Sequence, residues 1–377
     1  MTGAWRLIVE DGVDAAEGLA TDEYLMGGYA GSSIPPPTLR LYTYRTYCAL
    51  IGRFQDPAAE LSLDECAATG TQVNRRPTGG GAIIMGEDQL GLALVTSLRD
   101  PITPPHARAI VDAFARGILA GLSRLRITGE LRGKNDIAVG GRKVAGLGMY
   151  ADRNDAVLFH ASILAGLDVE FMLRVLNIPA AKLAGKAIST VRERVTTVSS
   201  QTGRRVEVDE VRAHVAEGFE EAFGIRLESR PIDPEERAGA IELAVQKYGT
   251  PEWVMQRVAE APAGSSIAKT AGGLLRICVG TSGEAIKDVM ITGDFIAADS
   301  GLAELEAALR WVSAERTRVE QAVAEGTRRG GGLMGIEADV LSEAIWQAIV
   351  DARARRGSPG SCYYPQHQTN EEARAWR

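Results

Sequence analysis

The chain has 377 residues, of which 45% are hydrophobic and 24% are charged, and its formal net charge is −7 at pH 7. This composition is ordinary for a globular protein, and the charge gives no overall attraction to nucleic acid or to an anionic membrane. We find no signal-peptide core after Met1 and no apolar run near the roughly 20 residues of a membrane-spanning helix. We therefore expect neither a nucleic acid nor a membrane as a partner.

Hydrophobic periodicity predicts the elements of the first 230 residues in chain order. Strands are expected over 5–9, 39–44, 48–52, 88–98 and 157–164, and helices over 14–29, 58–69, 107–125, 168–176 and 209–223. Strands and helices do not alternate as regular βαβ units, which indicates an α+β protein with a mainly antiparallel sheet. Residues 1–230 are predicted to form one large domain.

The remainder of the chain is predicted to hold a small α+β domain. Residues 231–255 are charged and interrupted by prolines, which favours a linker that begins a helix, and a helix is predicted over 236–247. Two strands over 272–279 and 285–292, followed by helices over 302–312 and 338–353, predict a compact domain over 256–357. Within it Arg328-Arg329-Gly330-Gly331-Gly332 is interpreted as a loop, and residues 358–377 as a tail.

The four cysteines are widely separated in the sequence. They are Cys48, Cys66, Cys278 and Cys362. No CxxC pair or metal-binding spacing occurs among them, so neither a disulfide framework nor a zinc site is predicted. Free thiols in a reducing compartment are the expectation, which favours a cytoplasmic location.

The first candidate binding feature is a run of three glycines, Gly79 to Gly81, that follows the pair Arg75-Arg76. Glycine weakens regular elements, so such a run indicates either positive φ or close approach of a ligand to bare N–H groups. Backbone N–H groups and guanidinium groups together form anion sites, and phosphate is the anion most often bound there. A flexible surface turn with solvated arginines is the alternative interpretation of this stretch alone.

The second candidate feature is a hairpin predicted around the two-residue turn Gly140-Gly141. Regular pairing sets Ala138 opposite Lys143 and Ile137 opposite Val144. One face then carries Ile137, Val139, Arg142 and Val144, and the other carries Asp136, Ala138, Lys143 and Ala145. The second face has a lysine and a carboxylate with small alanines between them, which is typical of a ligand-lined surface. A solvated strand face is the alternative.

Together these stretches resemble the lipoate–protein ligase family, whose catalytic fold is shared with biotin ligases and lipoyl or octanoyl transferases. The matching motifs are Arg75-Arg76, Gly79-Gly80-Gly81-Ala82, Gly141-Arg142-Lys143-Val144-Ala145-Gly146, Ile51 to Pro57, Asn135-Asp136, Phe159 to Leu164, and Lys186 to Val195. The resemblance extends from about Trp5 to about Phe223, with a weaker continuation to about Val350. It implies a catalytic domain of the biotin/lipoate ligase type over 1–230 and an accessory domain over 256–357.

The resemblance also implies roles for single residues. Lys143 matches the lysine that bridges a carboxylate and the α-phosphate of ATP, and is the catalytic candidate. The candidates for binding nucleotide and acyl chain are Arg76, Gly79, Gly80, Gly81, Ala82, Ile83, Ile84, Asn135, Asp136 and His160. Asp136 either binds Mg²⁺ or orients Lys143, because spacing alone does not decide between these roles. For His160, a place near the acyl pocket and a satisfied buried histidine are equally consistent.

The activity implied by the resemblance is ATP-dependent ligation of lipoate or octanoate to a lysine of a lipoyl-domain protein. Such acceptors include the E2 component of dehydrogenase complexes and the H protein of glycine cleavage. Because a carboxylate is a poor electrophile, it first attacks the α-phosphorus of ATP to give acyl-AMP and pyrophosphate, and the lysine amine then displaces AMP. The protein mainly positions the reactants and stabilises charge. A monomer is expected.

Two alternatives remain open from the sequence. A transferase of the same fold would pass the acyl group through a cysteine thioester, which requires an activated thiol near the site. No cysteine lies between Gly133 and Leu164, where such a thiol is expected. The second alternative is a non-catalytic protein that binds an acyl-adenylate or a lipoylated protein, and the presence of Lys143 and Arg76 argues against it.

The chain departs from the family's pattern at four places. Met85-Gly86 stands where the family often has His-Asp, Gln89 replaces an asparagine, Ala145 replaces a serine, and Pro77 follows the arginine pair. These departures bear on acyl-chain length and acceptor identity more than on adenylation.

Overall fold

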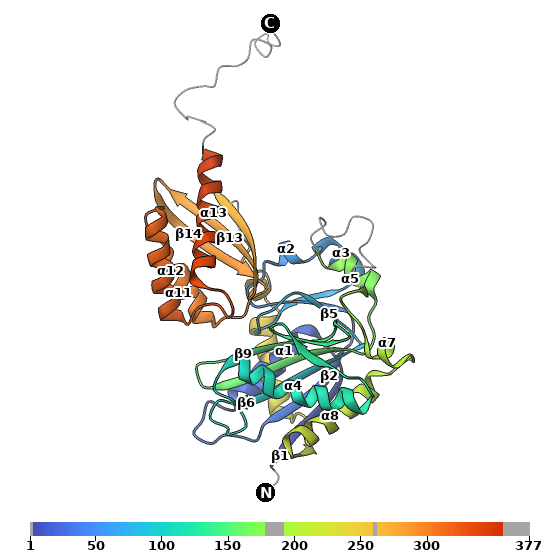
Figure 1. The fold of residues 1–377 in the computed structure, drawn as a ribbon. Coiled ribbons are helices and arrows are strands. Elements are labelled where there is room, and N and C mark those ends of the chain that lie inside the picture. The colour runs from blue at the N-terminus through green and yellow to red at the C-terminus, as the bar shows by residue number, and fades with distance from the viewer. Residues whose placement is uncertain (1–2, 178–191, 259–261, 357–377) are drawn as a thin grey trace. The chain divides into compact units, whose positions relative to one another are not determined.

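The computed structural model describes residues 3–177, 192–258 and 262–356, and Figure 1 shows their course. The chain divides into two compact units. The first unit contains Met1–Val258 and Thr292–Ala298, and the second contains Ala259–Ile291 and Asp299–Arg377. The chain thus returns once from the second unit to the first.

An eight-stranded sheet forms the centre of the first unit, in the order β11-β1-β2-β6-β10-β9-β8-β7. Its strands are β1 (Ala4–Val13), β2 (Thr38–Tyr44), β6 (Gln89–Ser97), β7 (Glu130–Arg132), β8 (Asp136–Val139), β9 (Arg142–Ala151), β10 (Ala156–Leu164) and β11 (Arg226–Ser229). Only the pairs β1–β11 and β1–β2 are parallel among these neighbours, and the others are antiparallel. The predicted α+β class with a mainly antiparallel sheet is confirmed.

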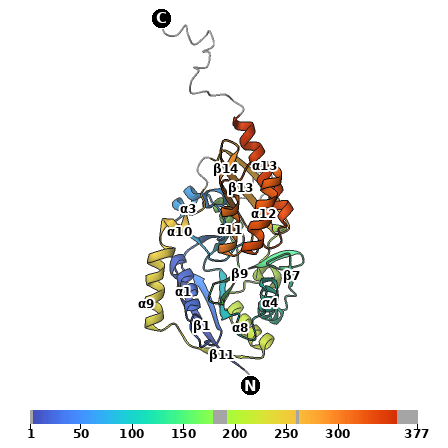
Figure 2. The same ribbon diagram turned by 90° about the vertical axis from the view of Figure 1, so that its left-hand side faces the viewer.

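Helices cover both faces of this sheet. On one face α4 (Ala107–Arg124) and α8 (Val208–Phe223) lie side by side, and their apolar stripes pack on the sheet through residues such as Phe114 and Phe219, both fully buried. On the opposite face α1 (Ala15–Gly27) packs against α9 (Pro234–Leu243), as Figure 2 shows. The strands between them are therefore shielded from water on both sides, which explains their continuous apolar runs.

A small sheet lies beside the large one in the first unit, in the order β4-β3-β5. Its strands are β3 (Cys48–Ile51), β4 (Gln72–Arg75) and β5 (Ile83–Met85), and short helices near it are α2 (Pro57–Glu60), α3 (Leu63–Thr69) and α5 (Val169–Val175). The short helix α7 (Val198–Thr202) packs instead on the core of the large sheet through Val198. The glycine run connects β4 to β5, so this sheet fixes both ends of the candidate anion-binding loop. Part of the Lys186 to Val195 motif lies outside the described residues.

Residues 231–255 differ from the predicted linker, because they belong to the first unit. They form α9, the π-helical turn η2 (Ala244–Tyr248) and α10 (Pro251–Val254). A capping box of Asp233 and Glu236 begins α9, and Glu236 also pairs with Arg6 at 2.5 Å. Tyr248 is fully buried. The helix predicted over 236–247 is confirmed, and the prolines and charges that also suggested a linker are helix-start residues and ion-pair partners.

The second unit combines a three-stranded sheet with three helices. The elements are β12 (Gly264–Thr270), β13 (Gly273–Ser282), β14 (Ala285–Gly293), α11 (Asp299–Leu309), α12 (Arg316–Gly330) and α13 (Ala338–Arg356). Arg328 and Arg329, which we interpreted as part of a loop, lie in the last turn of α12, so that prediction is wrong. The helix ends at Gly331 with φ of 78°, which is an ordinary glycine cap after a basic last turn. The predicted tail lies outside the described residues.

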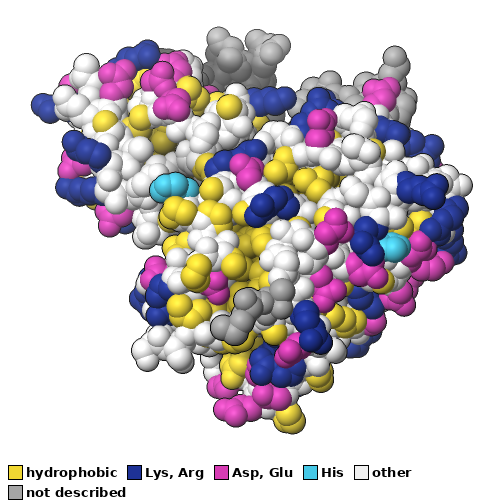
Figure 3. All heavy atoms as spheres, turned by 60° about the horizontal axis from the view of Figure 1, so that its bottom comes forward, with side chains coloured by type: hydrophobic (Ala, Val, Ile, Leu, Met, Phe, Trp, Pro, Cys, Tyr) yellow, Lys and Arg dark blue, Asp and Glu magenta, His cyan; other side chains and the backbone are white. Residues whose placement is uncertain are grey.

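The surface shown in Figure 3 mixes side chains of both charges. On this face Lys and Arg side chains lie among Asp and Glu side chains and not in one continuous block. Within the described ranges, no helix is both long and apolar enough to cross a membrane.

Candidate active site

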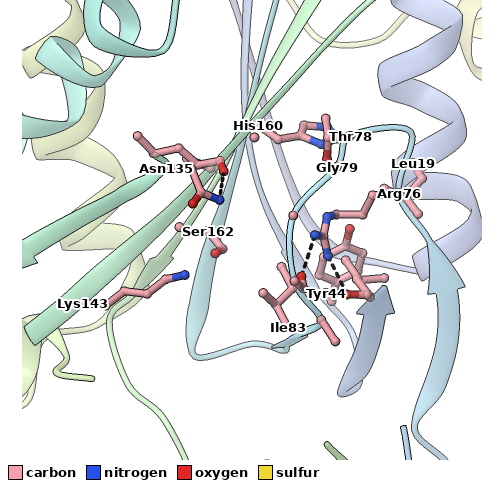
Figure 4. A pocket seen from close by; sticks show the side chains of 18 of the residues that line it. Leu19, Tyr44, Arg76, Thr78, Gly79, Ile83, Asn135, Lys143, His160 and Ser162 are labelled. Atoms are coloured by element: carbon pink, nitrogen blue, oxygen red, sulfur yellow. Dashed lines mark hydrogen bonds between the residues drawn. The ribbon is translucent and has the colours of Figure 1, made fainter. Parts of the chain in front are cut away.

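A cavity of about 90 Å³ lies in the first unit between the glycine run and the strands β9 and β10. Figure 4 shows Lys143 and Asn135 on one side of this pocket and Arg76 with Tyr44 on the other. The lining residues are Leu19, Tyr42, Tyr44, Leu50, Arg76, Thr78, Gly79, Gly80, Gly81, Ala82, Ile83, Asn135, Lys143, Gly146, Leu147, Gly148, His160, Ala161 and Ser162. The structure therefore brings the two candidate features of the sequence to one place.

Arg76 is a buried cation in the wall of this cavity. Its guanidinium donates to the carbonyl oxygens of Leu50 at 2.5 Å and Gly81 at 2.9 Å. Burial lowers the pKa of Arg76 to about 10, and no carboxylate in the described part of the chain forms an ion pair with it. A buried positive charge that has only neutral partners favours an anionic ligand.

Arg75 has a different role from its neighbour. Its guanidinium donates to carbonyl oxygens at 2.7 to 3.1 Å, which belong to Gly52, Arg53, Gln55, Trp253, Val254 and Gln256. Burial, together with the nearby charges of Arg53 and Arg257, lowers the pKa of Arg75 to about 9. Arg75 does not line the cavity and instead joins β4 to α10 and the residues just after it. Of the arginine pair, only Arg76 was named as a binding candidate, and it is the one that lines the cavity.

Glycine is required in this run by the backbone conformation and by close contacts with neighbouring backbone, as well as by the cavity. Gly80 has φ of 101°, a conformation that L residues rarely adopt. A Cβ atom on Gly79 would lie 2.4 Å from the carbonyl oxygen of Phe295. Ala82 and Ile83 line the cavity, whereas Ile84 points into a separate apolar cluster, because successive side chains of β5 face opposite ways. The structure thus does not place Ile84 in the cavity.

Lys143 lies on the cavity face of β9, but the hairpin is not regular. Ala138 pairs with Lys143 as predicted, whereas Ile137 pairs with Ala145, so Val144 is an extra residue that forms a β-bulge. Ala145, predicted on the ligand face, is therefore buried in the core. Gly146 takes its place, and a Cβ atom there would lie 2.9 Å from Nζ of Lys143. The bulge gives the lysine amine room beside the strand.

The Lys143 amine is held close to the predicted carboxylate. Its Nζ lies 2.7 Å from Oδ1 of Asp136, and both side chains are about one-third exposed, at 33% and 38%. Asn135 is fixed in the wall by donating from Nδ2 to the carbonyl oxygen of Leu147 at 3.0 Å. The main chain of Lys143 is also anchored, since its N–H donates to Arg194 and its carbonyl accepts from Thr196. The amine is thus positioned at the more open side of the pocket.

His160 reaches the cavity from β10 and is backed by a buried charge network. Its Nε2 lies 2.9 Å from Oδ2 of Asp22, whose other oxygen accepts from Arg40 at 2.8 Å. Burial opposes ionisation of Asp22, but the Arg40 charge and the His160 contact outweigh it, so the pKa of Asp22 is lowered. An ionised carboxylate can only accept, so Nε2 of His160 carries the hydrogen.

The sequence reasoning missed several residues of this site. Ser162 could have been found, because it lies two residues after His160 on a strand and so shares its face. Asp22 had no distinguishing signal, because Glu17 and Glu23 lie in the same predicted helix 14–29. The lining residues Leu19, Tyr44 and Leu50 come from three separate elements, so their meeting depends on tertiary packing and had no local signal.

Asp22→Asn is expected to lower stability at neutral pH, with a deficit that shrinks in acid. Because the folded-state pKa of Asp22 lies below 3.8, its ionised form contributes stability above that pH and loses it as the pH falls further. Urea unfolding of both proteins between about pH 2 and pH 7 measures the difference. A deficit that stays constant down to the acid limit would contradict the assigned charge state.

Comparison with known proteins decides the family. The model of the Lipoyl protein ligase A/B catalytic domain matches residues 14–220, which is more than half of the chain. The chain belongs to the lipoyl protein ligase A/B family. This result confirms the resemblance drawn from the motifs.

The lipoyl protein ligase A/B family includes similar proteins of two kinds. Octanoyltransferase LipM of Symbiobacterium thermophilum is 30% identical over 275 residues, which are 67% of this chain and 98% of that protein. A crystal structure of lipoate-protein ligase A bound with ATP is 29% identical, covers 68% of this chain and 99% of its own, and gives a TM-score of 0.57. LipL1 of P. falciparum, solved in complex with lipoate, covers 91% of this chain and 99% of its own at 17% identity, and its TM-score of 0.72 shows a shared fold.

The cysteines of this family member do not line the cavity as far as the structure describes them, although Cys48 packs in the same buried cluster as the lining residues Tyr44 and Leu50. Cys48 is fully buried, and burial raises the pKa of its thiol well above the ordinary value. Cys66 is also buried, and burial raises the pKa of its thiol. Cys278 lies in the second unit, and Cys362 is outside the described residues. No described cysteine lines the pocket.

Proposed function

We propose that this protein is an ATP-dependent ligase that joins lipoate or octanoate to a lysine of a lipoyl-domain protein through acyl-AMP. The observation that carries the proposal is that one cavity is lined by two cations, the Lys143 amine and the buried Arg76, which forms no ion pair with a described carboxylate. A lysine at the mouth and an arginine in the wall match the charges that develop when a carboxylate attacks a phosphate. In this proposal the first unit is the catalytic part and the second an accessory part.

The geometry supports different roles for Lys143 and Arg76. Lys143 would hold a carboxylate oxygen and the α-phosphate together, because its amine is a mobile donor with room beside Gly146. Arg76 would bind the phosphates, because its guanidinium is fixed by Leu50 and Gly81 before any ligand arrives. The side chains of Leu19, Tyr44 and Leu50, which line the cavity on the Arg76 side, would contact the acyl chain. His160 would line the acyl chain's path.

A magnesium ion fits this site as a partner of the substrate phosphates. Mg²⁺ is usually held by one or two carboxylates, waters and phosphate oxygens, and Asp136 offers one carboxylate next to Lys143. No group of three potential metal ligands occurs among the described residues, which is consistent with an ion bound mainly through the nucleotide. When bound, the ion would neutralise phosphate charge.

A thioester transferase is the second candidate, because octanoyltransferase LipM is among the similar proteins. That reaction needs a thiolate within reach of the acyl chain. The described cysteines do not supply one, since Cys48 and Cys66 are buried with raised pKa values and neither lines the cavity. The proposal therefore favours the ligase.

Pyrophosphate release tests the proposal directly. The full chain is incubated with ATP and Mg²⁺, with and without lipoate or octanoate, and pyrophosphate is measured. We expect release that depends on the added acid, before any acceptor protein is supplied. Acyl transfer to a lipoyl domain from an acylated carrier protein, without ATP and without pyrophosphate release, would show the transferase instead.

Replacement of all four cysteines by serine or alanine is expected to leave ATP-dependent activity within about threefold of the wild type, because the ligase uses no thiol. The fold of the variant is checked by its urea unfolding midpoint, and single replacements at Cys48 and Cys66 separate packing effects from chemistry. One single replacement that stops acyl transfer in a folded protein would establish the thioester route.

A further inference from the structure

A short part of the chain, Thr292–Ala298, packs in the first unit although the residues before and after it belong to the second. We call it the bridging segment. Gly293 donates its N–H to the carbonyl oxygen of Phe54 at 2.9 Å, and Gly80 donates its N–H to that of Phe295 at 3.3 Å. The rings of Phe54 and Phe295 stack at 5.1 Å, and both are buried. The segment is thus part of the first unit's core and touches the glycine run.

The bridging segment explains why Gly79 is a glycine. A Cβ atom on Gly79 would lie 2.4 Å from the carbonyl oxygen of Phe295 and 3.1 Å from Cα of Ile296. Both are backbone atoms, so a side chain at Gly79 could be accommodated only by moving the segment or the loop. The close approach attributed to a ligand from the sequence is, at this glycine, an approach of the chain's own backbone.

The same segment also reaches the hairpin that carries the catalytic candidate. Lys134 donates from Nζ to the carbonyl oxygen of Asp294 at 2.7 Å, and its amine lies 3.6 Å from Oδ1 of the same residue. Lys134 directly precedes Asn135 and Asp136, which line the cavity and pair with Lys143 respectively. One short segment therefore contacts both the loop that leads from Arg76 and the strand entry that leads to Lys143.

We propose that the bridging segment sets the relative position of Arg76 and Lys143, with Phe295 and Lys134 as the positioning residues for the activation step. The inference rests on the proposed function for its kinetic consequence only. Neither residue touches the substrate in this assignment, and each acts by fixing one side of the cavity. A misplacement of reacting groups by about 1 Å can cost on the order of 10² in rate.

Two variants test the assignment at two neighbouring positions of the segment, the contact to Asp294 and the ring of Phe295. Lys134→Met removes the amine but keeps an apolar stem of similar length, and Phe295→Ala removes the ring that stacks on Phe54. Ile345→Ala is the matched control, because Ile345 is also fully buried but belongs to the second unit, away from both peptides in the sequence. Hydrogen exchange is followed for peptides covering 76–84 and 133–147, and pyrophosphate release is measured below the unfolding transitions.

We expect both test variants to speed amide exchange in the two peptides and to lower kcat/KM for pyrophosphate release by about 10²-fold. Ile345→Ala should lose stability without either effect. Unchanged exchange in 76–84 and 133–147 for Lys134→Met and Phe295→Ala would overturn the proposal, whatever the activity is. If the wild type itself releases no pyrophosphate, the proposed function fails, while the exchange experiment still decides the role of the segment.

Discussion

Lys143→Ala is expected to lower the rate of acyl-AMP formation by about 10²–10³-fold, because one positioned donor to developing charge contributes that much to a rate. The amine faces the cavity beside Gly146 and pairs with Asp136 at 2.7 Å. No other lysine lines this pocket among the described residues, so no neighbouring amine can replace it. Single-turnover pyrophosphate release with lipoate measures the loss.

The fold should survive this substitution, since the Lys143 side chain is one-third exposed and its anchoring hydrogen bonds use the main chain. Lys287→Ala, at an exposed position in the second unit, is the matched control and should keep wild-type activity. Near-normal turnover in Lys143→Ala would remove the lysine from the reaction and with it the main support for an adenylating ligase.

Although Arg75 and Arg76 are neighbours, we expect Arg75→Met mainly to lower stability and Arg76→Met mainly to lower the rate of activation. Arg75→Met leaves several buried carbonyl oxygens without a donor, and should lower the free energy of unfolding by about 3–5 kcal/mol. Arg76→Met uncovers only the carbonyls of Leu50 and Gly81, and should mainly reduce activation, by about 10²–10³-fold. Urea unfolding and pyrophosphate release are measured on both variants.

The contrast between the two arginines is the informative result. Equal losses of stability with equal losses of activity would show that neither arginine has a separate role in binding. A raised KM for ATP in Arg76→Met, with an unfolding midpoint near that of the wild type, would support phosphate binding. The same kinetic change in Arg75→Met at low temperature would contradict the assignment of Arg75 to the scaffold.

The class of the fold and most of the site could be predicted, because the motifs carry tertiary information in their order. The glycine run, Lys143 and His160 lie in one cavity as expected. Local patterns also placed α4 and α8 correctly, since long amphipathic helices have a strong periodic signal. These predictions needed no knowledge of how the chain crosses between its units.

Two of the predictions that failed have local causes, the helix that contains Arg328 and the β-bulge after Lys143, and the others depend on contacts distant in sequence. Three of the carbonyl partners of Arg75 lie over 253–256, far along the chain, and nothing close to Arg75 distinguishes it from Arg76. The segment 231–255 also suggests a linker because its buried anchor, Tyr248, follows a charged stretch of the sequence. The bridging segment was not predicted at all, because a strand that ends in Gly293 carries no sign that its continuation enters another unit.

The extra residue in β9 leaves a signature that can be read in other sequences. In a regular strand, residues two apart share a face, yet Lys143 and Gly146 are three apart and both face the cavity. After the bulge the spacing returns to two, since Gly148 also lines the cavity. A Lys-x-x-Gly-x-Gly pattern within a predicted strand therefore indicates a β-bulge after the lysine, with two glycines on the cavity face, the first of which leaves open space beside the lysine side chain. A chain with one residue fewer between the lysine and the glycine would have a regular strand without the bulge. A sequence alignment that ignores this one-residue difference would not separate the two kinds of chain.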